Sequence, residues 1–371
     1  MKFCARQFLV LFLLLSLTVS ACAFSEKDEI KKAVALVLDP LKDFDSADIY
    51  DYLAQTDIFP GDHADIQDES AIRDTFMLFY RDFAYKVREI NLHENEDTSE
   101  GPVPADTAEA VVELNVPDGR RIAEDLIKEE LTRRILQQAS ENVSSDTAHA
   151  SFPLQERFQL LYSLLSDNTY KTTVKKTEIK LQKSGDSWQV ERTHALGDAL
   201  TGGLSRSLTD PELLSPSQTL ELYLTAITKM SPEQLESYLE LESFAGYGEV
   251  EDERITLALI GQIRQFFSCS VSDAQIKGYQ ATVPVKIRTF DKDRIMTRFY
   301  EKADRYLQTA DAVIDGLSGR TDTMRDLMVE AIETNTEAVW RDASFSMIND
   351  GTGWQPADGG HVLGEALLGL A

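Results

Sequence analysis

In this 371-residue chain, two histidines each lie four residues before a carboxylate residue. Of the patterns in the sequence, this spacing is the one best suited to acid–base chemistry. The pairs are His194 with Asp198 and His361 with Glu365. On a helix, the two members of each pair would share one face, and the carboxylate could orient the imidazole for proton transfer. A lone His–carboxylate pair lacks a nucleophile. We therefore expect a structural role, in which each histidine and the Leu-Gly turn after it cap the last strand, and we predict no catalytic residue.

The other histidines and the acidic clusters give no basis for a metal site. Three histidines lie in acidic or Ser-rich sequence without zinc-motif spacing: His63, His93 and His149. Four aspartates form a cluster that could suggest calcium: Asp39, Asp43, Asp45 and Asp48. The cluster lacks both the glycine of a calcium loop and its glutamate at the twelfth position. We expect Asp45 and Ser46 to cap a helix instead.

Nucleophiles and cofactor motifs are also missing from the sequence. No serine sits in a Gly-x-Ser-x-Gly motif and no glycine-rich loop follows a strand pattern, so we expect neither acyl transfer nor a cofactor. Cys269 lies among apolar residues in a strand pattern, and we interpret it as a small hydrophobic side chain. Trp188 and Trp354 each follow a predicted hairpin turn, where we expect core residues rather than ligand platforms.

The elements that must position these residues occur twice along the chain. The segment His194–Leu200 reappears as His361–Leu367. Further pairs match upstream in the same order: Trp188 with Trp354, Asp118 with Asp291, and Tyr85 with Cys269. The separation between partners changes only across polar stretches, where insertions are tolerated. We therefore predict an internal repeat. The chain then divides into a signal peptide at residues 1–21, a first repeat at 22–204, a linker at 205–214 and a second repeat at 215–371.

Each repeat shows helices first and then two pairs of strands separated by a helical pair. Ser215 and Ser231 each begin a capping box followed by proline, which predicts two helix starts. Alternating apolar residues around Val285 predict a half-buried strand, and Asp350-Gly351 predicts a hairpin turn. The fold class is therefore α+β, with a four-stranded antiparallel sheet in each copy. The sequence lacks βαβ alternation, which argues against a doubly wound sheet.

The N-terminus has the pattern of an export signal. Lys2 and Arg6 precede an apolar run from Phe8 to Val19, which is too short to span a bilayer and is followed by small residues and Cys22. Val19-Ser20-Ala21-Cys22 resembles the lipobox of bacterial lipoproteins, which implies a lipid on Cys22 and cleavage before it. The alternative is ordinary signal cleavage after Ala23. We expect an extracytoplasmic, lipid-anchored protein.

Composition excludes one class of partner. The chain has 37 Lys plus Arg against 63 Asp plus Glu, a net charge of −26, and no basic stripe. Such a surface repels phosphate, so we expect no nucleic-acid partner.

Together, the lipobox and the tandem α+β repeats resemble uncharacterised bacterial lipoproteins with cystatin-like or nuclear-transport-factor-like domains. That resemblance implies a curved sheet that wraps helices around a pocket. Our leading hypothesis is a non-enzymatic binding protein of the cell envelope, whose partner is an envelope protein, a peptide or a small apolar ligand. The alternatives are a pocket isomerase or lyase that uses a His–carboxylate pair, and the solute receptor of a transporter.

Overall fold

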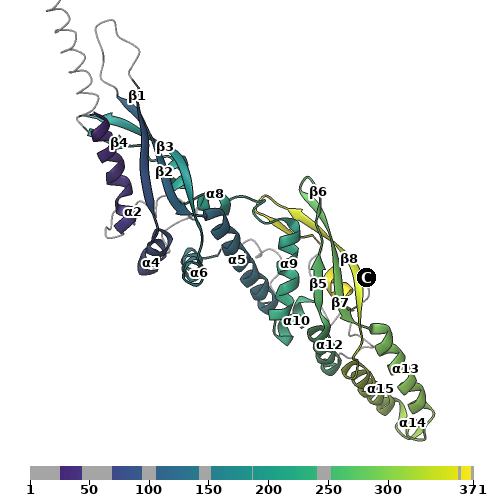
Figure 1. Cartoon of the computed structure of the whole chain (residues 1–371). Helices are drawn as coiled ribbons and strands as arrows, with labels where there is room; N and C mark the ends of the chain where they lie inside the picture. Colours follow the sequence, from purple (N-terminus) through teal and green to yellow (C-terminus); the bar gives the residue numbers. More distant parts are fainter. Residues whose placement is uncertain are drawn as a thin grey trace, which may run out of the picture. The chain divides into compact units, whose positions relative to one another are not determined.

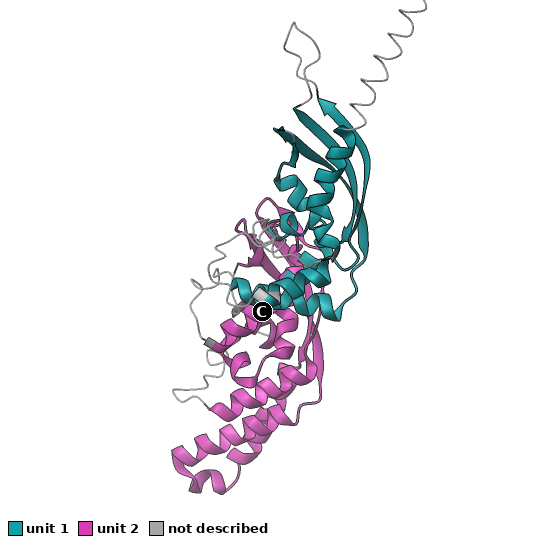
Figure 2. Cartoon of the chain, turned by 90° about the vertical axis from the view of Figure 1, so that its left-hand side faces the viewer, with its two compact units in different colours: residues 1–126, 152–209 teal, residues 127–151, 210–371 magenta. Residues whose placement is uncertain are grey.

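The computed structural model describes residues 26–43, 69–93, 106–141, 152–185, 187–239, 252–357 and 361–368. The predicted lipidation of Cys22 lies outside these residues, as do the predicted cap at Asp45 and Ser46 and the histidines His63 and His149. The chain divides into two compact units (Figure 2). Unit 1 comprises Met1–Leu126 and Phe152–Thr209, and unit 2 comprises Ile127–Ser151 and Asp210–Ala371.

Unit 1 contains a four-stranded antiparallel sheet, as the sequence predicts. Its strands pair in the order β1 (Ala84–His93), β2 (Thr107–Pro117), β3 (Thr172–Ser184) and β4 (Ser187–Val190) (Figure 1). Alternate side chains of the central strand β2 are buried, including Ala110, Val112 and Leu114. Because buried side chains alternate in this way, one face of the strand points toward a layer of helices.

The described helices of unit 1 are a helix over residues 26–38, α2 (Pro40–Asp43), α4 (Glu69–Phe79), the first turns of α5 (Gly119–Glu141), α6 (Leu154–Asp167), α7 (His194–Leu200) and α8 (Leu204–Leu208). α4 packs on α6, where the rings of Phe76 and Phe158 meet edge to face at 5.9 Å. α5 and α6 form the predicted helical pair between the two pairs of strands. α8 overlaps the stretch 205–214, for which the sequence suggests only a linker.

Unit 2 contains a second, curled antiparallel sheet with five strands. The order is β5 (Ser268–Val271), β7 (Gln280–Phe290), β8 (Ala338–Asn349) and β9 (Trp354–Pro356), and β6 (Gln275–Lys277) also pairs with β7. The prediction of four strands is therefore wrong for this unit. Lys277 pairs with Gln280 across a two-residue turn, and Gly278 in that turn has φ +63°. A positive φ suits a tight hairpin, so this local turn adds β6.

Among the residues that the structure describes, the helices of unit 2 are α9 (Pro216–Ala226), the 3-10 turn η3 (Ile227–Lys229), α10 (Pro232–Tyr238), α12 (Glu253–Phe266), α13 (Lys292–Leu307), α14 (Asp311–Ile314), α15 (Gly316–Glu333), α16 (His361–Leu368) and the later turns of α5. Both predicted capping boxes are confirmed, because Ser215 and Ser231 each accept a hydrogen bond from the backbone of the glutamine three residues later. α9, α12 and α16 all contact β7 and cover the buried face of the sheet.

The pairing registers of the two sheets agree with the alignment of the two repeats. Ala84 faces Asn115 in unit 1, and their aligned counterparts Ser268 and Arg288 face each other in unit 2. The same holds at the hairpin that closes each sheet. There, Lys183 faces Trp188 in unit 1, and the aligned residues Asn349 and Trp354 face each other in unit 2. The two sheets therefore share strand order and register, apart from β6.

Candidate functional site

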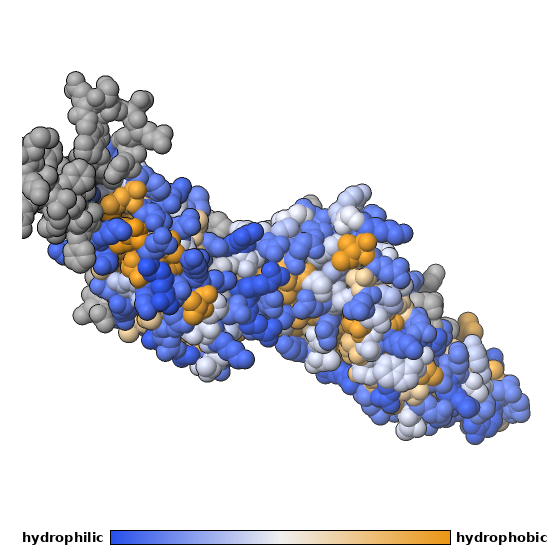
Figure 3. Space-filling model, turned by 45° about the horizontal axis from the view of Figure 1, so that its top comes forward, coloured by the Kyte–Doolittle hydropathy of each residue, from blue (hydrophilic) through white to orange (hydrophobic). Residues whose placement is uncertain are grey.

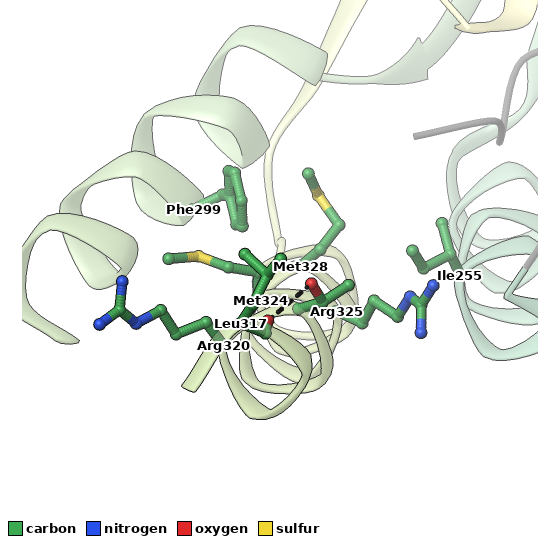
Figure 4. Close-up of a pocket in the computed structure, with 8 residues that line it drawn as sticks. Ile255, Phe299, Leu317, Arg320, Met324, Arg325 and Met328 are labelled. Carbon is green, nitrogen blue, oxygen red and sulfur yellow. Dashed lines mark hydrogen bonds between the residues drawn. The ribbon is translucent and has the colours of Figure 1, made fainter. Parts of the chain in front are cut away.

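A pocket of about 280 Å³ lies among three helices of unit 2, α12, α13 and α15 (Figure 4). The residues that line it are mostly apolar: Ile255, Phe299, Leu317, Arg320, Thr321, Met324, Arg325 and Met328. An apolar cavity of about 150 Å³ is enough to bind benzene. The pocket therefore has room for an apolar group of the size of a large side chain.

Helical spacing brings these apolar side chains together. Leu317, Met324 and Met328 repeat at intervals of seven and four residues along α15, which places them on one face. Phe299 approaches from α13 and Ile255 from α12, and both of these helices pack on α15. Methionine side chains are flexible and polarisable, so they adapt to ligands of differing shape.

Two arginines stand at the edge of this pocket. The Arg320 guanidinium donates through Nε to the Ala312 carbonyl oxygen, and Arg325 donates through Nη1 to Asp322 at 3.2 Å. Thr321 donates its hydroxyl to the Leu317 carbonyl oxygen at 3.1 Å. The pocket thus combines an apolar floor with two arginines at its edge, of which Arg325 already forms an ion pair with Asp322.

Leu317 of the pocket and three residues of the nearby α13–α15 connection expose apolar side chains. Leu317 is 85% exposed, and Leu307, Val313 and Ile314 are also more than half exposed. Elsewhere, the surface in Figure 3 is mainly hydrophilic, with apolar residues gathered in separate patches. Exposed apolar patches of this kind are typical of interaction surfaces.

The structure does not join His194 to Asp198. His194 is exposed at the first position of α7, and no hydrogen bond links these two described residues. Asp198 is partly buried, and its Oδ1 atom has no hydrogen-bond partner among the described residues. The Leu-Gly turn expected after His194 is wrong, because Leu196 and Gly197 continue the helix that the Thr193 side chain caps.

The second predicted pair lies in the corresponding place of unit 2. His361 is the first residue of α16, and its side chain is outside the described part of the chain. Glu365 is partly buried in the same helix. The remaining described histidine, His93, is exposed on β1, with Nε2 3.5 Å from Glu109 on β2.

The two tryptophans singled out in the sequence are core residues, as predicted. Trp188 and Trp354 are only 6% and 5% exposed. Trp354 donates its indole N–H to Glu212 at 3.1 Å, whereas the indole N–H of Trp188 has no acceptor among the described residues. Cys269 lies on β5 and packs against the core, and burial raises the pKa of its thiol. A thiol held in its neutral form is a poor nucleophile.

A second pocket, of about 400 Å³, was not foreseen from the sequence. It is formed by the start of α13 and the start of β8 and is lined by Asp291, Asp293, Arg294, Thr297, Val339, Trp340 and Arg341. Trp340 is 59% exposed. Alternation along the strand, which places Phe345 and Met347 inward, would have indicated that Trp340 points outward.

Of the four clustered aspartates, only Asp39 has its side chain in the part of the chain that the structure describes. Asp39 accepts hydrogen bonds from Lys42 at 2.8 Å and from the Tyr85 hydroxyl at 2.9 Å. The hydrogen bond from Lys42, followed by that from Tyr85, lowers the pKa of the Asp39 carboxyl despite some desolvation. No group of three metal-binding side chains occurs among the described residues.

Comparisons with known proteins leave the structure as the guide to function. No protein-family model, curated protein or solved structure matches this chain. Among the described residues, no helix is both long enough and apolar enough to cross a membrane.

Proposed function

We propose that this protein is a lipid-anchored, extracytoplasmic binding protein that holds an apolar group of a cell-envelope partner. The observation that carries the proposal is the pocket among α12, α13 and α15, with its apolar floor of Phe299, Met324 and Met328. The neighbouring exposed residues Val313 and Ile314 extend the apolar surface beyond the pocket, as a protein partner requires.

The polar residues of the pocket favour binding over catalysis. General acid–base catalysis needs a group that titrates near the operating pH. The polar lining consists of Arg320, Arg325 and Thr321, and none of these is a residue type usual in that role; the Thr321 hydroxyl also already donates to a backbone carbonyl. Arginine is suited instead to pairing with a carboxylate or phosphate, and Arg325 already pairs in this way with Asp322.

We also propose that both units descend from one duplicated module. The alignment of the two repeats was found in the sequence, yet it reproduces the pairing registers of both sheets. Because a one-residue slip turns every side chain to the opposite face, agreement of register at both ends of the sheets supports common descent. A relation to cystatin-like or nuclear-transport-factor-like lipoprotein domains belongs to the same proposal.

The lipid anchor has a direct test. Intact-mass analysis of the protein from the membrane fraction should find acyl groups on an N-terminal Cys22, and a Cys22→Ser variant should leave the membrane. If the naturally processed protein is soluble and begins at Phe24, the proposed anchor is wrong.

Binding is tested with 1-anilinonaphthalene-8-sulfonate, an apolar fluorophore that carries one negative charge. The probe should bind the full mature Cys22→Ser chain, and Met324→Glu should weaken binding at least tenfold, because a carboxylate would enter the apolar floor. The matched control is Leu36→Glu, at an apolar side chain of unit 1 that is 78% exposed. Equal affinity of the Met324 and Leu36 variants contradicts the proposed pocket.

A photo-cross-linking amino acid tests whether this pocket contacts a partner in the cell. Placed at Leu317, it should give a discrete product with one envelope protein, and adding Met324→Glu should abolish that product. The same amino acid at Leu36 serves as the control. Products that are identical at both positions reject a specific partner at this site.

A further inference from the structure

The second pocket of unit 2 has a chemical character different from that of the first. We propose that this pocket, at the start of α13 and β8, binds a neutral carbohydrate. The inference does not depend on the apolar pocket or on the lipid anchor. Its volume of about 400 Å³ lies within the range of about 300–1,000 Å³ that is usual for ligand pockets.

Backbone and side-chain contacts hold the two walls of this pocket together. The Asp291 N–H donates to the Glu337 carbonyl oxygen at 3.0 Å, which joins the start of α13 to the residue just before β8. The Glu337 carboxylate also forms ion pairs with Arg294 at 3.2 Å and with Arg298 at 2.9 Å. The site is therefore built on regular elements rather than on loops, which favours a fixed geometry.

An exposed indole supplies the stacking surface. Trp340 is 59% exposed, whereas both other tryptophans lie in the core. An indole offers a broad apolar face and an N–H donor, which matches the apolar face and the hydroxyls of a sugar ring. The fold does not require tryptophan here, because the corresponding position in the sheet of unit 1 is Val174 on β3, which faces Asn115 as Trp340 faces Arg288.

The charged groups of the pocket balance one another. The Asp291 carboxylate accepts a hydrogen bond from the backbone N–H of Arg294 at 3.2 Å, and the Arg294 guanidinium is paired with Glu337. Asp293 remains as an acceptor. Arg341 follows Trp340 on β8 and so leaves the opposite side of the strand, but it also lines the pocket, and its buried Nε has no partner among the described residues.

This balance selects the class of ligand. An anion would meet two aspartates and a cation would meet two arginines, so net charge on the ligand is unfavourable in either sense. A carboxylate and a guanidinium each offer paired planar hydrogen-bonding positions, which suit adjacent hydroxyl groups. A neutral sugar combines such hydroxyls with an apolar ring face.

Isothermal titration calorimetry of the full mature chain tests the proposal with four tetrasaccharides. Two are neutral, tetra-N-acetylchitotetraose and maltotetraose; one is anionic, a sulfated heparin tetramer; and one is cationic, the deacetylated chitosan tetramer. At least one neutral probe should bind with one-to-one stoichiometry, and more tightly than either charged probe. Trp340→Ala should weaken that binding at least tenfold, and Asp293→Asn or Arg341→Gln at least threefold.

Tyr300→Ala is the matched control, because Tyr300 is equally exposed at 59% and lies on α13 but does not line this pocket. It should leave the saccharide affinity unchanged, and circular dichroism should show every variant folded. The proposal is overturned if neither neutral probe binds at millimolar concentration, or if a charged probe binds more tightly. Parental affinity in the Trp340 variant would overturn it as well.

Discussion

At the scale of single residues, a close backbone crossing in unit 1 depends on two glycines. A Cβ atom on Gly202 would lie 2.1 Å from the Pro117 carbonyl oxygen, and one on Gly119 would lie 2.3 Å from that of Thr201. The absence of a Cβ atom at both positions therefore lets the end of α7 lie close to the junction of β2 and α5. Gly202 also has φ +63°, a conformation that other residues rarely adopt.

Gly202→Ala should therefore destabilise unit 1 by more than the usual cost of placing alanine at positive φ, about 1–2 kcal/mol. The matched control is Gly185→Ala, because Gly185 has φ +62° but a Cβ there would meet no atom within 4 Å. Urea unfolding of both variants separates the two effects. Equal losses would mean that the crossing relaxes without cost.

At the scale of elements, carboxylates connect the first helices of each unit to the sheet. In unit 1, Lys183 at the end of β3 lies 2.7 Å from Glu26. In unit 2, the corresponding Asn349 at the end of β8 donates to Glu212 at 2.9 Å, just before α9. Unit 1 has a further link, because Tyr85 on β1 donates to Asp39 between the first two helices.

The Tyr85 link predicts a dependence of stability on pH. Burial, and then the hydrogen bond to Asp39, raise the pKa of Tyr85 from 10.0 to about 12. Because the folded state retains the phenol proton longer than the unfolded state, this contribution is complete below about pH 10 and is lost as pH rises toward 12. Tyr85→Phe should therefore show a smaller loss of stability between pH 9 and 11.5 in urea unfolding.

Tyr162→Phe is the control for this measurement, because Tyr162 lies on α6 of the same unit and is 41% exposed. Its alkaline loss should equal that of the parent protein. An unchanged alkaline slope in Tyr85→Phe would show that the Asp39–Tyr85 link is not maintained in solution.

At the scale of the whole molecule, sequence repeats and compact units do not share their boundaries. The stretch 127–151 precedes the end of the first repeat, yet it belongs to unit 2. Ile135 and Ala139 of α5 are buried in the core cluster of that unit, beside residues such as Leu224 and Leu235. Gln234 of α10 also donates to the Leu136 carbonyl oxygen at 2.9 Å.

Ile135→Ala should therefore loosen unit 2, although residue 135 lies in the first repeat. Removing a fully buried isoleucine to alanine costs about 2–5 kcal/mol. Hydrogen exchange should accelerate mainly at β7 and β8. Ile122→Ala, at an equally buried position of the same helix, should act mainly on β2 and β3. The reverse pattern, or the same pattern from both variants, would contradict the division of α5.

Short-range patterns in the sequence were enough to predict much of the fold. The capping boxes at Ser215 and Ser231 join residues three positions apart, and the strand around Val285 follows a period of two. Both were confirmed because such features depend on near neighbours. The antiparallel α+β class followed from the order of these local elements.

The candidate site was much less predictable. The sequence drew attention to His194 and Asp198, whereas the structure gathers Phe299 and Met324 in one pocket and Asp293 with Trp340 in another. The two members of each of these pairs come from different elements, and no spacing rule relates them. The tight turn at Gly278 that adds β6 was also missed.

By itself, the sequence determined the export signal pattern, the acidic charge, the alignment of the repeats and the antiparallel α+β class. Each of these properties follows from the composition of the chain or from the order of residues that are close together in the sequence. Only the tertiary structure decided that α5 divides between the units, that Trp340 lies in an open pocket while Trp188 and Trp354 are buried, and that α12, α13 and α15 surround an apolar cavity. These features depend on which side chains, distant in the sequence, pack together and exclude water. That packing is defined only by the three-dimensional structure.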